Sequence, residues 1–431
     1  FGVAWHLGEE EFIKRLGFIS LIKIRYSWGQ SGNAPSGTSP YIGTFEAVTP
    51  GYGDMNAVKP ASPDLTHLKY ETITSNNIGV DFGLFSDKVN FTFELYKKVT
   101  DDLLQKKMKV PSSTGLSTVA WYNSGKIQNK GWEFNIDIAA VKTKDWSFNF
   151  GFNISQNKNE ILELPENKND ELYTFGNKNY AYSVMMGDPL GSFYGYRYKG
   201  VYQNVEETYA VNTSGQRILD IDGNPVVMKN GDQKVYPGDA RYEDVNGDGV
   251  IDENDIVYLG NSNPTLTGGL NFTLRYKKVS LVAAFHGRAG QKVINQARMD
   301  MENMRGKNNQ SVAVLRRWRS EGDDTDIPRA LYDKGYNYLG SDRFVEDASF
   351  LRLKTVTLKY QMPAKWMKAI GVNKLELYAT GYDMFVWTKY KGQDPEVNLK
   401  AANDGTVAQV AIDSNNTPKP FKIAFGLNLN F

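Results

Sequence analysis

The chain has 431 residues, 41% of them apolar, and its 50 Lys and Arg nearly balance its 49 Asp and Glu. Because it contains no cysteine, a disulfide-stapled module and a cysteine-ligated metal centre are excluded. The balanced charge argues against a nucleic-acid-binding protein. No apolar run approaches the roughly 20 residues of a transmembrane helix, although a β-barrel crosses lipid with a polar average composition. Since the chain starts at Phe1 without methionine, we expect it to be processed or to be part of something longer.

Apolar and polar residues alternate with a period of two along much of the chain, which is typical of strands with two different faces. The runs 131–141 and 146–155 are separated by only a short connection, which predicts a hairpin. Alternation is clearest in 421–431 and least regular in 349–360. We predict about ten strands, most of roughly 8 to 12 residues, the length that crosses a hydrocarbon layer when tilted. They are 19–30, 78–84, 89–96, 131–141, 146–155, 270–276, 281–285, 349–360, 374–387 and 421–431.

The connections between these strands alternate strictly between short and long. This order predicts an all-β fold, a transmembrane antiparallel up-and-down β-barrel with tight periplasmic turns and long extracellular loops. A small amphipathic helix is expected at 9–16, in a periplasmic turn. The short connections lie near 86–88, 142–145, 277–278 and 361–373, and the long ones cover 31–77, 100–130, 157–266, 288–348 and 388–420.

Two features of this prediction stay open. The region 157–266 can hold either no further membrane crossing or two, because both leave the order of the strands unchanged. A soluble β-sandwich is the alternative fold, since its strands also alternate. Five loops of about 30 or more residues without regular structure would be unusual in such a sandwich.

Five segments, spread in order over nearly the whole chain, resemble one protein family. They are Ile22–Asn33, Gly187–Tyr196, Asp239–Pro264, Phe350–Tyr360 and Phe385–Glu396. In this order they resemble the SusC/RagA family, which are TonB-dependent outer-membrane transporters of Bacteroidetes. The resemblance implies a multi-pass barrel of 22 strands in the outer membrane, closed by an N-terminal plug that receives energy through a TonB box.

Neither a plug nor a TonB box is present in this chain, so residues 1–431 resemble the C-terminal portion of such a barrel, and 157–266 would be a large extracellular loop region. The resemblance implies a SusD-like surface lipoprotein as partner, TonB as a partner of the N-terminal half, and import of oligosaccharides or peptides. The alternative is a SusC-like scaffold subunit of an outer-membrane assembly or secretion complex, with no transport role. A soluble calcium-stabilised binding module is a third interpretation.

The segment 244–255 has the spacing of a twelve-residue calcium-binding loop, with Gly249 at the position of the sharp turn. Its last position is Asp255 instead of the usual, longer glutamate, which resembles a dockerin-like variant. We expect a structural calcium ion that orders a large loop with little core of its own. The alternative is a turn rich in Asp, Asn and Gly whose side chains cap their own backbone. The expected ligands are Asp244, Asn246, Asp248, the carbonyl of Val250, Asp252 and Asp255.

Motifs for catalysis are not found in the sequence. The three histidines, His6, His67 and His286, are isolated from each other, and no nucleophile elbow, zinc-protease motif or phosphate-binding loop occurs. We therefore expect that the protein is not an enzyme and binds no organic cofactor.

Aromatic residues of the predicted loops are candidates for substrate contact, because sugar rings stack on aromatic faces. The alternative is that they pack the loops or form the aromatic girdle at the membrane interface. Trp387 and Tyr390, just beyond the outer end of a strand, are interpreted as girdle residues. The substrate candidates are Trp121, Tyr122, Tyr194, Tyr196, Tyr198 and Tyr202.

The last residue, Phe431, ends a strand of alternating apolar residues. Such an end resembles the signal that the outer-membrane assembly machinery reads. The alternative is that Phe431 merely completes the lipid-facing side. Deleting Phe431 is expected to impair barrel insertion if the residue is a signal.

Overall fold

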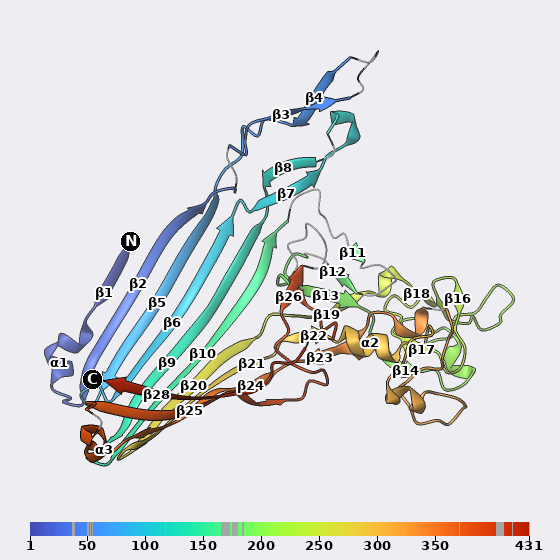
Figure 1. Ribbon diagram of the computed structural model, residues 1–431. Coiled ribbons are helices and arrows are strands. Elements are labelled where there is room, and N and C mark those ends of the chain that lie inside the picture. Colours follow the sequence, from blue (N-terminus) through green and yellow to red (C-terminus); the bar gives the residue numbers. More distant parts are fainter. Residues whose placement is uncertain are drawn as a thin grey trace.

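The computed structural model describes the whole chain except residues 37–38, 50, 52, 54, 117, 165–172, 175–179, 183–184, 334, 370, 402–408, 416 and 431. Its main feature is a curved sheet of long strands that carries a compact body of loops at one end (Figure 1). None of the described helices is long and apolar enough to cross a membrane.

Eleven strands form this sheet, and each pairs in antiparallel fashion with the next one. Among the described residues, β1 and β28 have a partner on one side only, so the sheet is an open, partial barrel. All ten predicted strands are confirmed. The additional strand is β1, whose four residues are too few to show alternation. The sheet comprises β1 (Gly2–Trp5), β2 (Ile19–Asn33), β5 (Glu71–Leu84), β6 (Val89–Asp101), β9 (Lys126–Lys142), β10 (Trp146–Glu163), β20 (Leu266–Tyr276), β21 (Val279–Ala289), β24 (Phe350–Gln361), β25 (Lys374–Thr388) and β28 (Lys422–Asn430).

The short and long connections lie at opposite ends of the sheet, as predicted. The short-turn end carries α1 (Glu11–Lys14) and α3 (Ala364–Ala369), and the expected helix at 9–16 contains α1 (Figure 1). Between β10 and β20, none of the described strands joins the main sheet. The described residues between these two strands therefore add no crossing to the sheet, in agreement with the first of the two possibilities for 157–266.

The two faces of the sheet differ in chemistry because successive side chains of a strand point to opposite sides. On one face large apolar side chains are exposed, among them Ile78 and Leu95. On the other face Arg25 lies 3.2 Å from Asp81 and forms an ion pair with Glu94. An apolar face that continues over neighbouring strands needs lipid or another apolar partner, and the polar face is suited to a barrel interior.

The irregular alternation of 349–360 has a structural cause. Lys354 is a β-bulge: Leu353 and Thr355 have register partners on β21 and β25, and Lys354 has none. The extra residue changes the parity of the strand, so Leu351 before the bulge and Leu358 after it are both exposed. A period-two pattern cannot continue through such a position.

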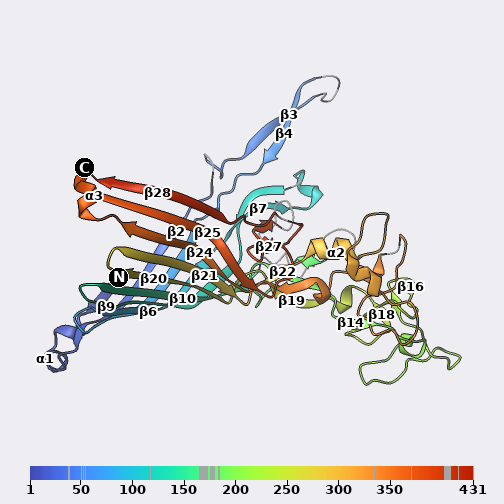
Figure 2. The same cartoon turned by 60° about the horizontal axis from the view of Figure 1, so that its bottom comes forward.

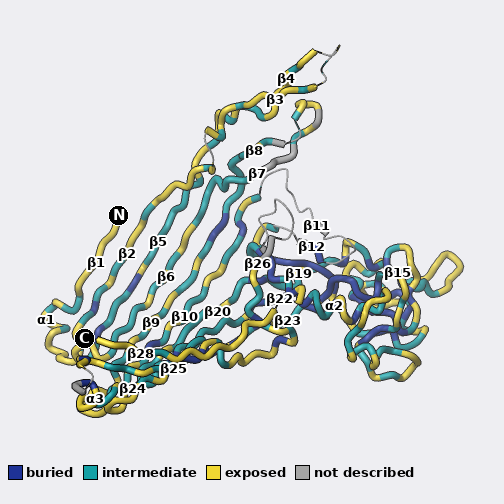
Figure 3. The backbone as a smooth tube through the Cα atoms, viewed as in Figure 1, coloured by how far each residue is buried: buried dark blue, intermediate teal, exposed yellow. Residues whose placement is uncertain are grey.

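Three of the long connections fold together, and we call their described residues the loop domain (164–265, 290–349 and 389–421). It lies beyond one end of the sheet and contains most of the buried residues (Figure 3). Its small elements are β11 (Tyr173–Thr174), β12 (Ala181–Tyr182), β13 (Ser192–Gly195), β14 (Tyr198–Val201), β15 (Lys229–Asn230), β16 (Gln233–Lys234), β17 (Ala240–Tyr242), β18 (Val250–Ile251), β19 (Val257–Asn261), β22 (Lys292–Ile294), α2 (Gln296–Glu302), β23 (Val345–Asp347), β26 (Leu399–Ala401) and β27 (Gln409–Ala411).

The expectation of a large loop with little core is wrong. Phe193 from the first connection, Ile294 and Phe344 from the second, and Val410 from the third are all buried in one cluster. This cluster draws on all three connections, whereas a second buried cluster, which includes Tyr202, Val235 and Ile251, comes mainly from the first connection. The other two long connections project separately as hairpins, β3 (Thr44–Val48) with β4 (Ala57–Ser62) and β7 (Leu104–Lys109) with β8 (Thr118–Asn123) (Figure 2).

Candidate functional site

The predicted calcium loop is wound around the side chain of Asp244. One carboxylate oxygen, Oδ1, accepts a hydrogen bond from the backbone N–H of Gly247 at 2.8 Å, and Oδ2 accepts one from Gly249 at 2.8 Å. Both glycines have a positive φ, 70° for Gly247 and 85° for Gly249, and residues with a Cβ rarely adopt such angles. The two glycines allow the backbone to turn tightly enough to place its N–H groups around this carboxylate.

Asp255 closes the same loop from its other end. Its Oδ1 accepts from the N–H of Val245 at 2.7 Å and its Oδ2 accepts from the N–H of Asp252 at 2.9 Å. The side chain is fully buried, and burial raises its pKa. Asp255, the last residue of the segment, is therefore bound to Val245 near its start and to Asp252.

The chemistry of the loop suits a hard cation, but its oxygens are not gathered into one site. Four carboxylates, one amide and one carbonyl provide the oxygen ligands that calcium prefers. In the described part of the chain, no cationic side chain forms an ion pair with any of the four aspartates. Equally, no group of three acidic or histidine side chains among the described residues converges as a ready metal site. The segment thus has the donor set, and calcium stays a prediction.

The four tyrosines near residue 200 belong to the interior of the loop domain. Tyr194, Tyr196 and Tyr202 are buried, and the hydroxyl of Tyr194 donates to Asp188 Oδ2 at 2.6 Å. The hydroxyl of Tyr198 donates to the carbonyl of Asp326 at 2.6 Å. Burial raises the pKa of Tyr196 and of Tyr202 to about 12. The structure places these rings where they pack the loops, which is the alternative raised from the sequence.

Trp121 and Tyr122 lie in β8, in a hairpin at the long-loop end of the sheet, far along the chain from the tyrosine group. The hydroxyl of Tyr122 donates to Gln105 Oε1 on β7 at 2.8 Å, which fixes its ring against the hairpin. Both side chains are partly exposed. The structure does not bring them together with the buried tyrosines, and their contact with substrate stays a prediction.

The two residues interpreted as girdle differ. Trp387 lies on β25 with its ring stacked near Phe285 and is half exposed, as a girdle residue would be. For Tyr390 the interpretation is wrong. Its ring is buried in the loop domain, and its hydroxyl donates to Asp413 Oδ2 at 2.7 Å. Strand β25 ends at Thr388, between these two residues. Tyr390 therefore packs into the loop domain and does not lie at the membrane interface.

A charged group that the sequence did not indicate joins two connections of the loop domain. Asp239 is fully buried, and its carboxylate accepts from Arg329 Nε at 2.7 Å and from Asn337 Nδ2 at 3.3 Å. These residues are about 90 positions apart in the chain, so no local spacing could reveal them. Near the long-loop end of β24, buried Arg352 similarly donates to Asp394 Oδ1 at 2.6 Å.

The remaining sequence predictions concern assembly and catalysis. Phe431 lies outside the described residues, so its role as an assembly signal stays a prediction. His286 lies within β21 with its ring beside Phe350, and His6 and His67 lie in distant parts of the chain. The structure does not bring the three histidines together.

Comparisons with known proteins match this architecture. The sequence model of the family described as "TonB dependent receptor-like, beta-barrel" matches residues 1–224. TonB-dependent receptors P3 and P26 of Formosa agariphila are 30% and 31% identical over 442 residues, covering 100% and 99% of this chain and 41% and 42% of those proteins. The TonB-dependent receptor SusC of Bacteroides thetaiotaomicron is 27% identical over 447 residues, covering 100% of this chain and 39% of that protein.

The fold also matches a solved structure, described as that of the RagAB peptide transporter. The TM-score is 0.75 at 22% sequence identity, over 100% of this chain and 43% of that one. At this identity the likeness concerns the fold alone. This chain spans about two fifths of the length of the relatives it matches.

Proposed function

The chain belongs to the TonB dependent receptor-like β-barrel family of the bacterial outer membrane, and we propose that it forms the C-terminal portion of the barrel of a SusC-type importer. One observation carries this proposal: eleven meandering strands with one apolar and one polar face, whose long connections all lie at one end. Relatives that match the whole chain are named TonB-dependent receptors, and no enzyme is among the relatives named here. The polar face would line the path of the cargo.

The proposed cargo is an oligosaccharide or a peptide. Ion pairs such as that of Arg25 with Asp81 and Glu94 provide both donors and acceptors on the polar face. One relative with 27% identity is named SusC, and the RagAB structure is described as a peptide transporter. The description of the RagAB structure supports a peptide as cargo, and the polar face is equally suited to an oligosaccharide. Energy would come from TonB through the N-terminal half of the full-length protein.

Uptake of labelled cargo tests this function. Cells that express the full-length protein are expected to accumulate a fluorescent oligosaccharide or peptide, and accumulation should stop when the TonB box of that protein is deleted. The scaffold alternative predicts a different result: uptake stays the same after deletion of the whole gene, and a co-purifying outer-membrane complex falls apart.

We also propose that a SusD-like surface lipoprotein covers the long-loop end. Phe45 on β3 and Val58 on β4 are 73% and 74% exposed, and the hairpin that carries them projects from this end (Figure 2). Exposed apolar side chains that lie together mark surfaces for protein contact. Phe45→Asp combined with Val58→Asp is expected to reduce co-purification of the lipoprotein, and Phe12→Asp, at an exposed site of α1 at the short-turn end, is the control. Equal yields from both variants would contradict this contact.

For the segment 244–255 we propose a structural calcium ion held by Asp244, Asn246, Asp248, the carbonyl of Val250, Asp252 and Asp255. The ion would draw the oxygens together and neutralise carboxylates that have no cationic partner. Calcium at about 100 times its Kd is expected to raise the free energy of unfolding of the loop domain by about 3 kcal/mol.

Thermal unfolding with calcium and with a chelator tests this site, and Asp248→Asn should abolish the calcium-dependent shift. The matched control is Asp220→Asn, because Asp220 also accepts hydrogen bonds from its own turn, from the N–H groups of Asp222 at 2.9 Å and Asn224 at 2.8 Å. A turn that only caps its own backbone would show no calcium-dependent shift in the wild type.

A further inference from the structure

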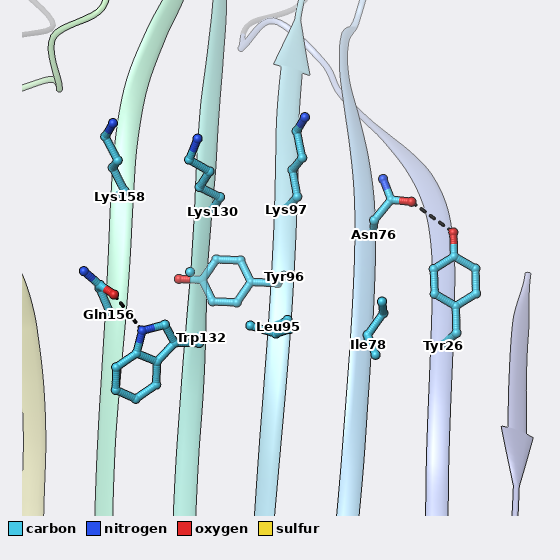
Figure 4. Close-up of a pocket in the computed structure, with 11 residues that line it drawn as sticks. Tyr26, Asn76, Ile78, Leu95, Tyr96, Lys97, Lys130, Trp132, Gln156 and Lys158 are labelled. Carbon is cyan, nitrogen blue, oxygen red and sulfur yellow. Dashed lines mark hydrogen bonds between the residues drawn. The ribbon is translucent and has the colours of Figure 1, made fainter.

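Three lysine side chains form a row across the membrane-facing side of the sheet. Lys97 on β6 is the direct register partner of Lys130 on β9, which is in turn the direct partner of Lys158 on β10. All three are exposed, and by their period-two position they share the face of Leu95 and Trp132. Figure 4 shows them side by side on three adjacent strands. We call these residues the lysine row.

Such a row is unfavourable without a counter-ion. Like charges that lie directly opposite each other on neighbouring strands repel. Glu160 lies 3.8 Å from Lys130 Nζ and 3.5 Å from Lys158 Nζ, and in the described part of the chain no carboxylate forms an ion pair with Lys97. Three lysines and one glutamate leave a net charge of about +2.

The row borders an open groove of about 580 Å³ whose remaining lining is largely apolar. Below the lysines, Trp132 Nε1 donates to Gln156 Oε1 at 2.6 Å, and the Tyr26 hydroxyl donates to Asn76 Oδ1 at 3.0 Å (Figure 4). Aromatic rings with a hydrogen-bonded polar tip lie at the level where hydrocarbon meets lipid headgroups.

The position of the row along the strands identifies the leaflet. Lys97 lies in the last part of β6, close to the connection that leads to β7 at the long-loop end. Ile78 and Leu95 also line the groove, and they lie closer to the short-turn end than the lysines do. The charged part of the groove is therefore at the outer headgroup level, and its apolar part extends into the hydrocarbon.

We propose that the lysine row binds the phosphate group of an anionic lipid of the outer leaflet, with an acyl chain of that lipid in the groove. A phosphate monoester carries a charge near −2 at neutral pH, which matches the net charge of the row, and basic residues at a membrane surface attract anionic headgroups. A soluble anion would use the lysines but would leave the apolar groove without a ligand. Lysines that only extend their charged ends to the membrane interface would not need to be direct register partners on three adjacent strands.

Lipid binding by the full-length protein, purified in detergent and delipidated, tests this site. The probes are synthetic lipid A with two phosphates, the same glycolipid without phosphates, and inorganic phosphate. We expect the phosphorylated glycolipid to bind about tenfold or more tightly than the dephosphorylated one, and the variant with Lys97→Gln, Lys130→Gln and Lys158→Gln to lose about tenfold in Kd. Binding should weaken as salt is raised, because exposed charges are screened.

The matched control is Lys142→Gln, Lys144→Gln and Lys278→Gln, which removes the same charge from exposed residues in or next to the turns at the opposite end of the sheet. It should retain wild-type affinity, and heat-modifiable migration on gels should confirm that both variants contain a folded barrel. Equal affinity of the wild type and the lysine-row variant would overturn the proposal. So would tight binding of the dephosphorylated glycolipid, or inorganic phosphate that competes as well as the lipid.

Discussion

The main sheet and the loop domain differ in where they place their large apolar side chains. In the sheet, Leu95 and Ile78 are nearly half exposed, whereas in the loop domain Phe193 and Ile294 are fully buried. The sheet relies on its backbone hydrogen bonds and on lipid as its apolar partner, while the loop domain has a core like that of a water-soluble protein. The two regions should therefore respond to different perturbations.

The largest effect is expected from a cavity in the loop domain. Phe193→Ala should lower the free energy of unfolding of the loop domain by about 3 to 5 kcal/mol, because a buried aromatic ring is removed from a packed cluster. Urea unfolding followed by limited proteolysis measures it. The control Phe93→Ala alters a side chain on the apolar face of the sheet and should leave the loop domain unchanged. If Phe193→Ala also abolished heat-modifiable barrel folding, the two regions would not be independent.

The buried ion pair gives the next largest effect. Asp239→Ala removes the carboxylate 2.7 Å from Arg329 Nε and one of the two acceptors of Asn337 Nδ2, which keeps the carbonyl of Arg329 at 3.1 Å. We expect a loss of about 3 kcal/mol, because Arg329, which is only 32% exposed, loses its counter-charge and the backbone N–H of Tyr236 loses its acceptor. The same unfolding measurement applies, and Asp239→Asn, which retains an acceptor, should lose less. Equal losses for the two substitutions would mean that the charge of Asp239 has no role.

Alkaline pH should destabilise the loop domain through its buried tyrosines. Burial raises the pKa of Tyr202 to about 12 and also raises the pKa of Tyr194 and Tyr198. The pKa of tyrosine in the unfolded chain is about 10, so the stabilisation is complete below pH 10 and is lost as the pH rises from about 10 to about 12. For Tyr202 the loss is about 2 to 3 kcal/mol.

Tyrosinate absorbance and circular dichroism across this pH range measure the effect. Tyr202→Phe should reduce the pH dependence, since phenylalanine has no proton to lose. A loop domain whose unfolding free energy is flat between pH 10 and 12 would show that these hydroxyls reach solvent in the folded state.

The contrast between the regions also explains what could be predicted from the sequence. Strands and turns follow from local alternation, which is why all ten predicted strands are present. The departures from the pattern include β1, which has only four residues, and bulges such as the one at Lys354. The calcium-type spacing of 244–255 is equally local. The pairing of Asp239 with Arg329 and the core that the three connections share are not local, because they bring together residues that lie far apart in the chain.

The lysine row shows the same limit within the sheet. Each lysine fits its own strand as an ordinary polar position, and its significance depends on the register that places Lys97, Lys130 and Lys158 opposite one another. That register cannot be predicted from a single sequence. The register depends on the lengths of the connections and on bulges such as the register shift between Phe148 and Asn149.

The smallest effect is expected from the ion pair of the β3–β4 hairpin. Glu46 Oε1 lies 2.8 Å from Lys59 Nζ, almost the distance of the Asp239–Arg329 pair, but both side chains are more than half exposed. Solvent screens an exposed pair, so Glu46→Gln should change the free energy of unfolding by less than about 1 kcal/mol. Proteolysis of the hairpin at low and high salt measures it. A loss as large as that of Asp239→Ala would mean that distance, and not burial, sets the strength of ion pairs in this protein.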